Sequence, residues 1–372
     1  MNHRQNILAI LNYQPYDHMP VISFGYWDDT VTKWANEGHI SHEEAADYIK
    51  NGDNHWGDKS IMQKLGFDFN WNSTFRPRMD LFPWFEEELL ETKPNGNLIQ
   101  REKQGLIVMV KPGTICVPSE IGTSLTDREA WETLYLPKLQ WSPDRFNRQA
   151  AERLIDDSKR EIPIGLHCGS LIGTMRNLLG VEGLSYLLVD DEDLFVEIAT
   201  TLAGLTHRIL EEVLKTGAKF DYAHYWEDIC FKNGPLVNPK LFHDLIGPLY
   251  KRNDRLLRDH GINIVSLDCD GLIDSLIPTW LENGVNTMFP IEVGTWGASI
   301  APWRAKYGRA LRGVGGMDKN VFAADRAAMD KEIERLKCLI KLGGYIPCPD
   351  HRMPPEANFE TVRYYCECMQ QQ

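Results

Sequence analysis

The stretch "IVSLDCDG" (residues 264–271) begins as a buried strand and ends in two carboxylates and a thiol. Apolar residues and one serine run as far as Leu267, and the group Asp268-Cys269-Asp270-Gly271 follows at once. In a parallel α/β barrel, catalytic groups lie at the C-terminal ends of the strands. The stretch therefore predicts a barrel strand whose polar end lies at the rim of the barrel.

Short apolar runs of this kind alternate with helical patterns from about Pro163 onward. Strand–helix alternation with short strands indicates a parallel sheet. We expect an α/β fold, a distorted (β/α)8 TIM barrel in which one strand is irregular or hidden, and an open doubly wound sheet is the alternative. The expected strands are 20–24, 163–167, 220–225, 262–267, 285–289, 310–314 and 345–348, and the expected helices are 194–214, 239–258 and 324–342.

The first part of the chain is less regular. Residues 87–118 are rich in strand formers and are broken at Pro94-Asn95-Gly96-Asn97 and near Gly105. Because Asn-Gly strongly favours a hairpin turn, we expect an N-terminal antiparallel β meander that caps the main fold. Within a single domain, residues 1–160 are then the N-terminal part of the barrel with its cap, and residues 161–372 are the regular barrel portion.

Composition and charge exclude several classes of protein. The chain has 372 residues, 43% hydrophobic and 25% charged, with a net charge of −13. This acidity argues against a nucleic-acid partner, which needs a basic face. No stretch is apolar enough to span a bilayer, and Met1–Asn6 leads into a short helical pattern without the apolar region of a secretory signal. We expect a cytoplasmic protein with no membrane partner. Separately, Ser41 to Glu44 has the spacing of a capping box, which predicts the start of a helix.

Polar residues collect where the expected strands end. Six of the seven ends carry a carboxylate and three carry a cysteine, at Cys168, Cys269 and Cys348. Carboxylates are common in solvated loops, whereas a cysteine that recurs at strand ends is harder to assign to solvation. Cys269 and Cys348 therefore look like a pair that the barrel brings together on a zinc ion, which binds thiolate, imidazole and carboxylate ligands. Without a local Cys-x-x-Cys spacing, two separately buried thiols are the alternative.

Longer stretches resemble the uroporphyrinogen decarboxylase superfamily, in the branch of corrinoid-dependent methyltransferases. The resemblance covers essentially the whole chain and implies a distorted (β/α)8 barrel. The stretches that carry it are "KWANEGHIS" (33–41), "GSLIGTMRNLLGVEGLSYLLVDD" (169–191), "HYWEDICFKNGPLVNPKLF" (224–242), "DCDGLIDSLIPTWLENGVNTMFPIEVG" (268–294), "GVGGMDKN" (313–320) and "GGYIPCPDHRMPPEANFETVRYY" (343–365).

The resemblance separates two activities. The decarboxylases carry an arginine-rich segment near the N-terminus that grips the substrate's carboxylates, but residues 24–28 here, Phe-Gly-Tyr-Trp-Asp, hold no arginine. The methyltransferases bind zinc through a His-x-Cys and a later Cys, which implies Cys269 and Cys348 as ligands. Leu267 stands at the histidine position, so Glu292 is the first substitute, and the rivals are His224, Glu227 and Asp268. Relatives that act on methoxylated aromatics tolerate carboxylate ligands.

We therefore expect a zinc-dependent methyltransferase that moves a methyl group from a small, methoxylated aromatic donor to a corrinoid protein. The chain has no Asp-x-His-x-x-Gly corrinoid module, so the corrinoid would come on a partner chain. A homodimer is also expected from the family. The alternatives are a metal-free lyase of the decarboxylase type and a non-catalytic binding barrel.

The expected site residues come from the same strand ends. Three of these residues have a structural alternative to their expected role. His351 would be a loop histidine held by the adjacent Asp350, Trp226 would pack at the barrel mouth, and Arg176 would form a surface ion pair. His167 with Cys168 is a further possible ligand pair. The expected catalytic residues are His351, Glu227 and Asp270; the expected substrate-binding residues are Tyr26, Trp27, His224, Trp226, Asp228 and Arg176; the expected metal ligands are Cys269, Cys348 and Glu292.

Overall fold

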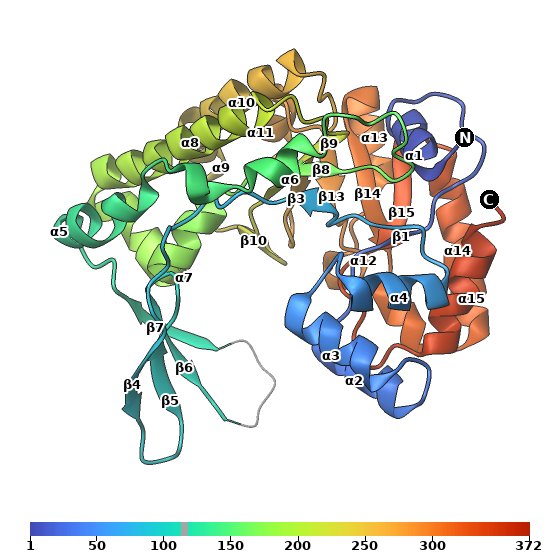
Figure 1. Ribbon diagram of the computed structural model, residues 1–372, viewed down its shortest axis with the longest axis horizontal. Helices are drawn as coiled ribbons and strands as arrows, with labels where there is room; N and C mark the ends of the chain where they lie inside the picture. Colours follow the sequence, from blue (N-terminus) through green and yellow to red (C-terminus); the bar gives the residue numbers. More distant parts are fainter. Residues whose placement is uncertain (113–117) are drawn as a thin grey trace.

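The computed structural model describes residues 1–112 and 118–372 (Figure 1). Its centre is a parallel sheet of seven strands in the order β15-β14-β13-β12-β9-β8-β3. The seven strands are β3 (Thr74–Phe75), β8 (Gly165–His167), β9 (Tyr222–Trp226), β12 (Val265–Asp268), β13 (Thr287–Phe289), β14 (Arg312–Met317) and β15 (Tyr345–Pro349). The expected strands from residue 163 onward are therefore confirmed.

A separate parallel pair, β1 (Ile22–Ser23) with β2 (Phe69–Asn70), lies between the two edges of this sheet. β1 contacts β15, and an isolated parallel bridge joins Tyr26 to Met353 beyond the ends of these strands. β2 leads directly into β3. The strand that the sequence pattern did not reveal is thus the broken segment β2–β3. The arrangement is consistent with a TIM-barrel-like fold, but the described residues do not form one continuous eight-stranded ladder.

Helices connect the strands and pack around them (Figure 1). The long ones are α7 (Ile172–Asp190), α8 (Glu192–Leu214), α10 (Gly247–Asp259), α14 (Arg326–Ile340) and α15 (Phe359–Met369). The shorter ones are α1 (His3–Leu11), α2 (Asp28–Asn36), α3 (His42–Asn51), α4 (Trp56–Leu65), α5 (Arg128–Ala130), α6 (Arg148–Glu152), α9 (Pro239–Leu241), α11 (Ile277–Glu282), α12 (Val293–Trp296) and α13 (Ile300–Tyr307). None of the helices in the described part of the chain is both long enough and apolar enough to cross a membrane.

The expected antiparallel meander is present. Its strands are β4 (Glu88–Thr92), β5 (Leu98–Arg101), β6 (Leu106–Val110) and β7 (Ser119–Thr123), paired in chain order. It projects from the body of the molecule below α7, which β6 and β7 contact (Figure 1). Cys116 and the rest of the segment 113–117, within the expected meander, lie outside the described residues. A small antiparallel pair, β10 (Cys230–Phe231) with β11 (Gly234–Pro235), follows β9.

The buried apolar residues form two clusters. The larger one lies on the α7–α8–α10 side of the sheet and includes Cys269. The second gathers the N-terminal helices, α14 and α15, and includes Cys348. The two thiols therefore belong to different packed regions.

Candidate functional site

A cavity of about 360 Å³ lies where the strands of the central sheet end. Half of its lining consists of residues that the sequence analysis had singled out as site residues: Trp27, His224, Trp226, Asp228, Asp270 and His351. The other half is Phe24, Asn72, Arg76, His167, Asp268 and Arg352. No described residue of the meander lines this cavity, so the expected cap does not cover it.

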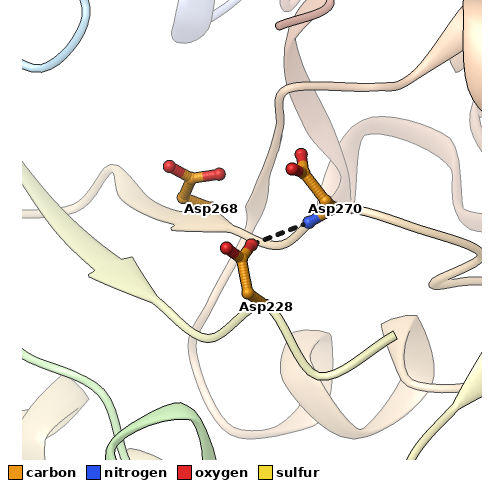
Figure 2. Close-up of side chains that lie close together, drawn as sticks. All are labelled: Asp228, Asp268 and Asp270. Carbon is orange, nitrogen blue, oxygen red and sulfur yellow. Dashed lines mark hydrogen bonds between the residues drawn. The ribbon is translucent and has the colours of Figure 1, made fainter. Parts of the chain in front are cut away.

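Three aspartates converge on one side of the cavity (Figure 2). Asp228 follows β9, Asp268 ends β12, and Asp270 comes two residues later. One carboxylate oxygen of each lies within 4.8 Å of the others. Asp228 is held from both sides, because its Oδ1 accepts the amide of Asp270 at 3.1 Å and its Oδ2 accepts the indole N–H of Trp226 at 3.0 Å.

The triad is electrostatically unbalanced. Burial raises the pKa of Asp228, and the charge of Asp270 adds to the shift. Burial also raises the pKa of Asp268 well above its usual value, with further contributions from Asp228 and Asp270. Among the described residues, the carboxylate of Asp268 has no hydrogen-bond or ion-pair partner, although the residue is only 8% exposed. The buried Oδ1 of Asp270 also has no partner. Such a cluster suits a cation.

His351 faces this triad from β15. Its Nε2 lies 3.2 Å from Oδ2 of Asp270, and its ring stacks on Trp27 with centroids 5.4 Å apart. Asp350 does not hold it: that carboxylate is buried and accepts the amides of Gly294 and Lys319. The alternative of a loop histidine held by Asp350 is therefore wrong.

Two more histidines line the cavity in neutral form. Burial lowers the pKa of His224 well below its usual value, and the ring Nδ1 lies 3.2 Å from the hydroxyl of Ser266. Burial, helped by the charge of Arg76, lowers the pKa of His167 to about 3. Nδ1 of His167 has no partner. Both rings therefore offer hydrogen bonds to a ligand without adding a positive charge.

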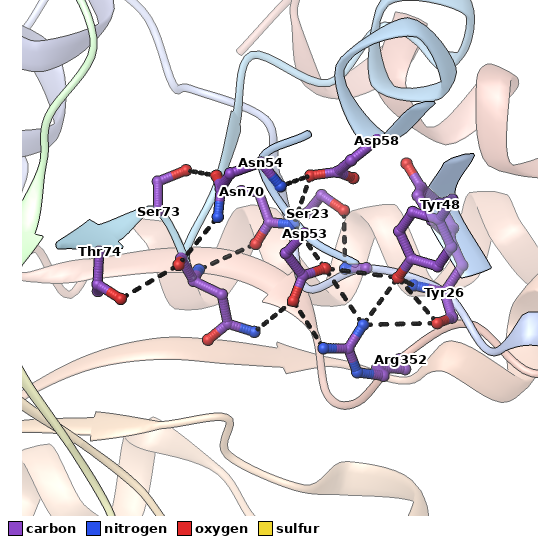
Figure 3. Close-up of polar contacts among 12 residues, drawn as sticks. Ser23, Tyr26, Tyr48, Asp53, Asn54, Asp58, Asn70, Ser73, Thr74 and Arg352 are labelled. Atoms are coloured by element: carbon purple, nitrogen blue, oxygen red, sulfur yellow. Dashed lines mark hydrogen bonds and ion pairs between the residues drawn. The ribbon is translucent and has the colours of Figure 1, made fainter. Parts of the chain in front are cut away.

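A dense polar network underlies the N-terminal wall (Figure 3). Arg352 pairs with Asp53 at 2.7 Å and donates to the hydroxyl of Tyr48 at 2.8 Å. Tyr48 in turn joins both backbone groups of Tyr26, whose ring is buried against Trp34. Tyr26 lies in this wall and does not line the cavity, and its role in binding a substrate stays a prediction.

Glu227 lies outside the cavity. Its buried carboxylate accepts the amides of Leu171 and Gly173 and the hydroxyls of Ser170 and Tyr250. These donors belong to the start of α7 and to α10, so the side chain ties two helices to the end of β9. Burial raises the pKa of Glu227 despite the four donors. The arrangement has the form of a structural anchor.

Arg176 does not line the cavity, and its role in binding a substrate stays a prediction. It donates to the backbone oxygen of Asp228 and lies over the ring of Trp226, 5.3 Å from its centroid. It forms no ion pair among the described residues, so the surface ion pair is not observed. It holds the β9 end in place behind the cavity wall.

The expected zinc ligands are not brought together. Burial raises the pKa of Cys269 well above its usual value, with further contributions from Cys230 and Asp228. Burial also raises the pKa of Cys348 well above its usual value. Glu292 accepts the amide of Gly271 and the hydroxyl of Thr295. Asp228, Asp268 and Asp270 are the one group within ligand range in the part of the chain that the structure describes, and neither thiol belongs to it.

Sequence reasoning missed Arg76, which follows β3 directly. Its Nε donates to the hydroxyl of Thr74 at 3.1 Å, and its guanidinium has no carboxylate partner among the described residues. The strand before it has only two residues, Thr74–Phe75, so no periodic pattern marked it. An arginine after an aromatic–polar run was the one available signal.

One of the comparisons with known proteins shows the family. The family model described as "Uroporphyrinogen decarboxylase (URO-D)" matches residues 98–372. None of the curated proteins matches the sequence. Among solved structures, a methyltransferase from Methanosarcina mazei has a TM-score of 0.61 and 13% identity, over 100% of this chain and 99% of that one. A B12-independent methionine synthase from Shewanella sp. W3-18-1 has a TM-score of 0.48 and 11% identity, over 95% and 96%. At such identities the likeness concerns the fold.

Proposed function

Because this chain belongs to the uroporphyrinogen decarboxylase family, we propose that it is a methyltransferase of that family. It takes the methyl group of a small methylated donor, a methoxylated aromatic compound, and passes it to a corrinoid carried by a separate protein. The observation that carries the proposal is the His351–Asp270 pair, which lies at 3.2 Å beside the aromatic wall of the cavity. The pair supplies a proton donor, and the aromatic wall beside it supplies a surface for a planar ring.

The donor ring is held by aromatic side chains. Trp27, Phe24 and Trp226 line the cavity, and Trp27 is 47% exposed, so it offers a free face. Aromatic side chains that line a cavity stack on a planar ligand. Trp27 also stacks on His351, so the leaving oxygen of a ring bound to Trp27 would lie near the imidazole.

His351 supplies the proton that the leaving oxygen requires. The carbon–oxygen bond of a methyl ether breaks more easily when the departing oxygen is protonated. Asp270 orients the ring through Nε2, and Nδ1 has no partner among the described residues. The proton passes from Nδ1 to the oxygen, and the product leaves as a phenol. The corrinoid, when its carrier protein is bound, supplies the nucleophile that accepts the methyl group.

We assign the metal of this proposal to the three aspartates. Asp268 has two free oxygens and Asp270 has one, all at the cavity. Carboxylate oxygens bind zinc and suit harder cations such as Mg²⁺ and Mn²⁺ better. When bound, such an ion would supply Lewis-acid activation of the donor oxygen, the alternative to its protonation by His351. The ligand set Cys269, Cys348 and Glu292 stays a prediction that the geometry does not support.

The second candidate is a metal-free decarboxylase. Residues 24–28 lack an arginine, and Arg352, which the structure adds to the cavity wall, is already paired with Asp53. A substrate with many carboxylates would meet three aspartates and a single unpaired arginine among the described lining residues. The carboxylates of the substrate and of the protein would repel each other at close range, which disfavours this candidate.

A methyl-transfer assay tests the proposal. The protein is mixed with a reduced corrinoid protein and with methoxylated aromatics, methylamines or methyl thiols, and the methylated cobalt is followed by its absorbance. We expect methylation with a methoxylated aromatic donor. Release of CO₂ from a porphyrinogen without methylation would select the decarboxylase instead. The absence of both reactions would favour a non-catalytic binding barrel.

A further inference from the structure

Strand register places Arg76 at one end of a row of side chains that crosses the sheet as far as Ser266. Phe75 is the partner of Leu166, so Arg76 continues β3 beside His167 of β8. His167 is the register partner of His224 on β9, and His224 is that of Ser266 on β12. Adjacent strands are about 4.8 Å apart, so the row spans about 14 Å along the sheet. The row begins at Arg76 and ends at Ser266, and Asp268 follows two residues later on β12.

The positive end of the row is not neutralised within the protein. The guanidinium of Arg76 has one hydrogen bond, from Nε to Thr74, and no carboxylate partner among the described residues. Arg352, the other arginine of the cavity, is paired with Asp53 and bonded to Tyr48. Arg76 is therefore the arginine that remains for a ligand among the described lining residues.

The neighbours of Arg76 favour a single anionic group. Nδ1 of the neutral His167 is unpartnered and stands next in the row. Its ring adds a hydrogen bond without a second charge. A dianion such as phosphate would need more than one cation, and the three aspartates that line the same cavity would repel it. A carboxylate matches both the charge and the forked geometry of one guanidinium.

We propose that the cavity binds substrates that carry one carboxylate, which pairs with Arg76 and directs the opposite end of the molecule toward Asp268, Asp270 and His351. This inference deepens the proposed function, on which it rests for the identity of the group that reacts. The carboxylate fixes which end of the donor faces His351. Methoxylated aromatics without an acid group bind more weakly and without a fixed direction.

Equilibrium binding tests the inference without turnover. Trp27 and Trp226 line the cavity, so their fluorescence reports occupancy. The probes are 4-methoxybenzoate and its neutral counterpart 4-methoxybenzamide, with benzoate and acetate as smaller acids. We expect the wild-type protein to bind the benzoate about 10- to 100-fold more tightly than the amide, the range of a charge-assisted pair. In Arg76→Gln this ratio falls to near one.

Arg78→Gln is the matched control. Arg78 is exposed, lies over the ring of Phe82 and does not line the cavity. We expect it to leave the ratio unchanged, and we expect Arg76→Lys to retain a reduced preference for the acid. Far-ultraviolet circular dichroism confirms that each variant is folded; should Arg76→Gln not fold, the lysine variant carries the comparison.

Several results would overturn the inference: equal affinity of the wild type for acid and amide, equal effects of the two glutamine variants, or no saturable binding of any of the acids. Its failure is distinguishable from that of the proposed function. Acid binding that depends on Arg76, without methyl transfer from any donor, rejects the methyltransferase and retains the carboxylate site. Methyl transfer that is indifferent to Arg76 does the reverse.

Discussion

The Nε2 atom of His351 lies 3.2 Å from Oδ2 of Asp270, although β13 and β14 separate their strands in the sheet. His351 follows β15 and Asp270 follows β12, so the two side chains meet across the curved sheet rather than on neighbouring strands. Trp27, from the segment after β1, stacks on the same imidazole. Three distant parts of the chain thus meet at one ring, which is how the fold assembles a proton donor against an aromatic wall.

Replacing this imidazole should affect donors according to their leaving groups. A general acid contributes about 10²- to 10⁴-fold to a rate. We expect His351→Gln to lower kcat by about 100-fold or more for an alkoxide-like leaving group. The loss should shrink for a methyl ether of a nitrophenol, whose oxygen leaves without a proton. Initial rates of corrinoid methylation across a series of donors measure this.

His260→Gln is the control for the loss of a histidine, because His260 is exposed at the end of α10. We expect its rates to match those of the wild type for every donor. An equal loss of rate in His351→Gln for good and poor leaving groups would instead assign His351 to positioning.

Two ligand sets make opposite predictions for the metal. Loss of a residue that only hydrogen-bonds to a metal ligand lowers metal affinity about 10- to 100-fold. We expect Asp268→Asn, which changes a ligand itself, to lower the affinity for Mn²⁺ or Zn²⁺ by at least as much. Cys348→Ala should leave it unchanged, because that thiol is packed in the second cluster and does not belong to the aspartate group. Isothermal titration of the protein freed of metal distinguishes the two. Loss of binding in Cys348→Ala alone would restore the thiolate site.

The regular half of the chain could be predicted because its pattern is local. Each strand from residue 163 onward is a short apolar run that ends in polar residues, and each one is present. The polar ends also predicted six lining residues of the cavity, including His351, Asp270 and Asp228. The position of a residue at a strand end follows from sequence order in a parallel sheet.

The direction of a side chain at a strand end does not follow from sequence. Glu227 and Asp228 are neighbours after β9, yet Asp228 lines the cavity and Glu227 turns back to α7. Asp228 has a positive φ of 46°, which redirects the chain between them. Cys269 follows β12 and Cys348 lies near the end of β15, which favours a pair from sequence order alone, but the two thiols pack in different clusters. Arg76 follows a strand too short to leave a pattern.

Stability in acid should depend on Glu44. Burial alone would raise the pKa of this carboxyl, but hydrogen bonds from Lys64, Ser60 and Ser41 outweigh it and lower the pKa to about 2. Because the folded pKa lies below the ordinary value of 4.5, the contribution is complete above pH 4.5 and is lost as the pH falls toward 2.

The Glu44→Gln variant makes that contribution measurable. We expect it to lower the free energy of unfolding by about 1–2 kcal/mol at pH 7, and the difference from wild type should shrink between pH 4.5 and pH 2. Urea unfolding at several pH values measures it. Glu43→Gln, at the exposed neighbouring position of α3, is the control and should change neither value. A difference that stays constant down to pH 2 would contradict the assignment.

Glu227 separates a structural anchor from a catalytic acid. All four partners of its carboxylate are donors, at the start of α7 and on Tyr250. A glutamine would turn its own N–H₂ toward one of these donors and leave it unpaired. We therefore expect Glu227→Gln to lower the free energy of unfolding by about 1–3 kcal/mol, with kcat per folded molecule close to that of the wild type. Glu182→Gln, at an exposed position of the same helix, should be neutral. A fall in kcat of about 100-fold with unchanged stability would return Glu227 to the chemistry, because a general acid in the reaction has that effect and an anchor does not.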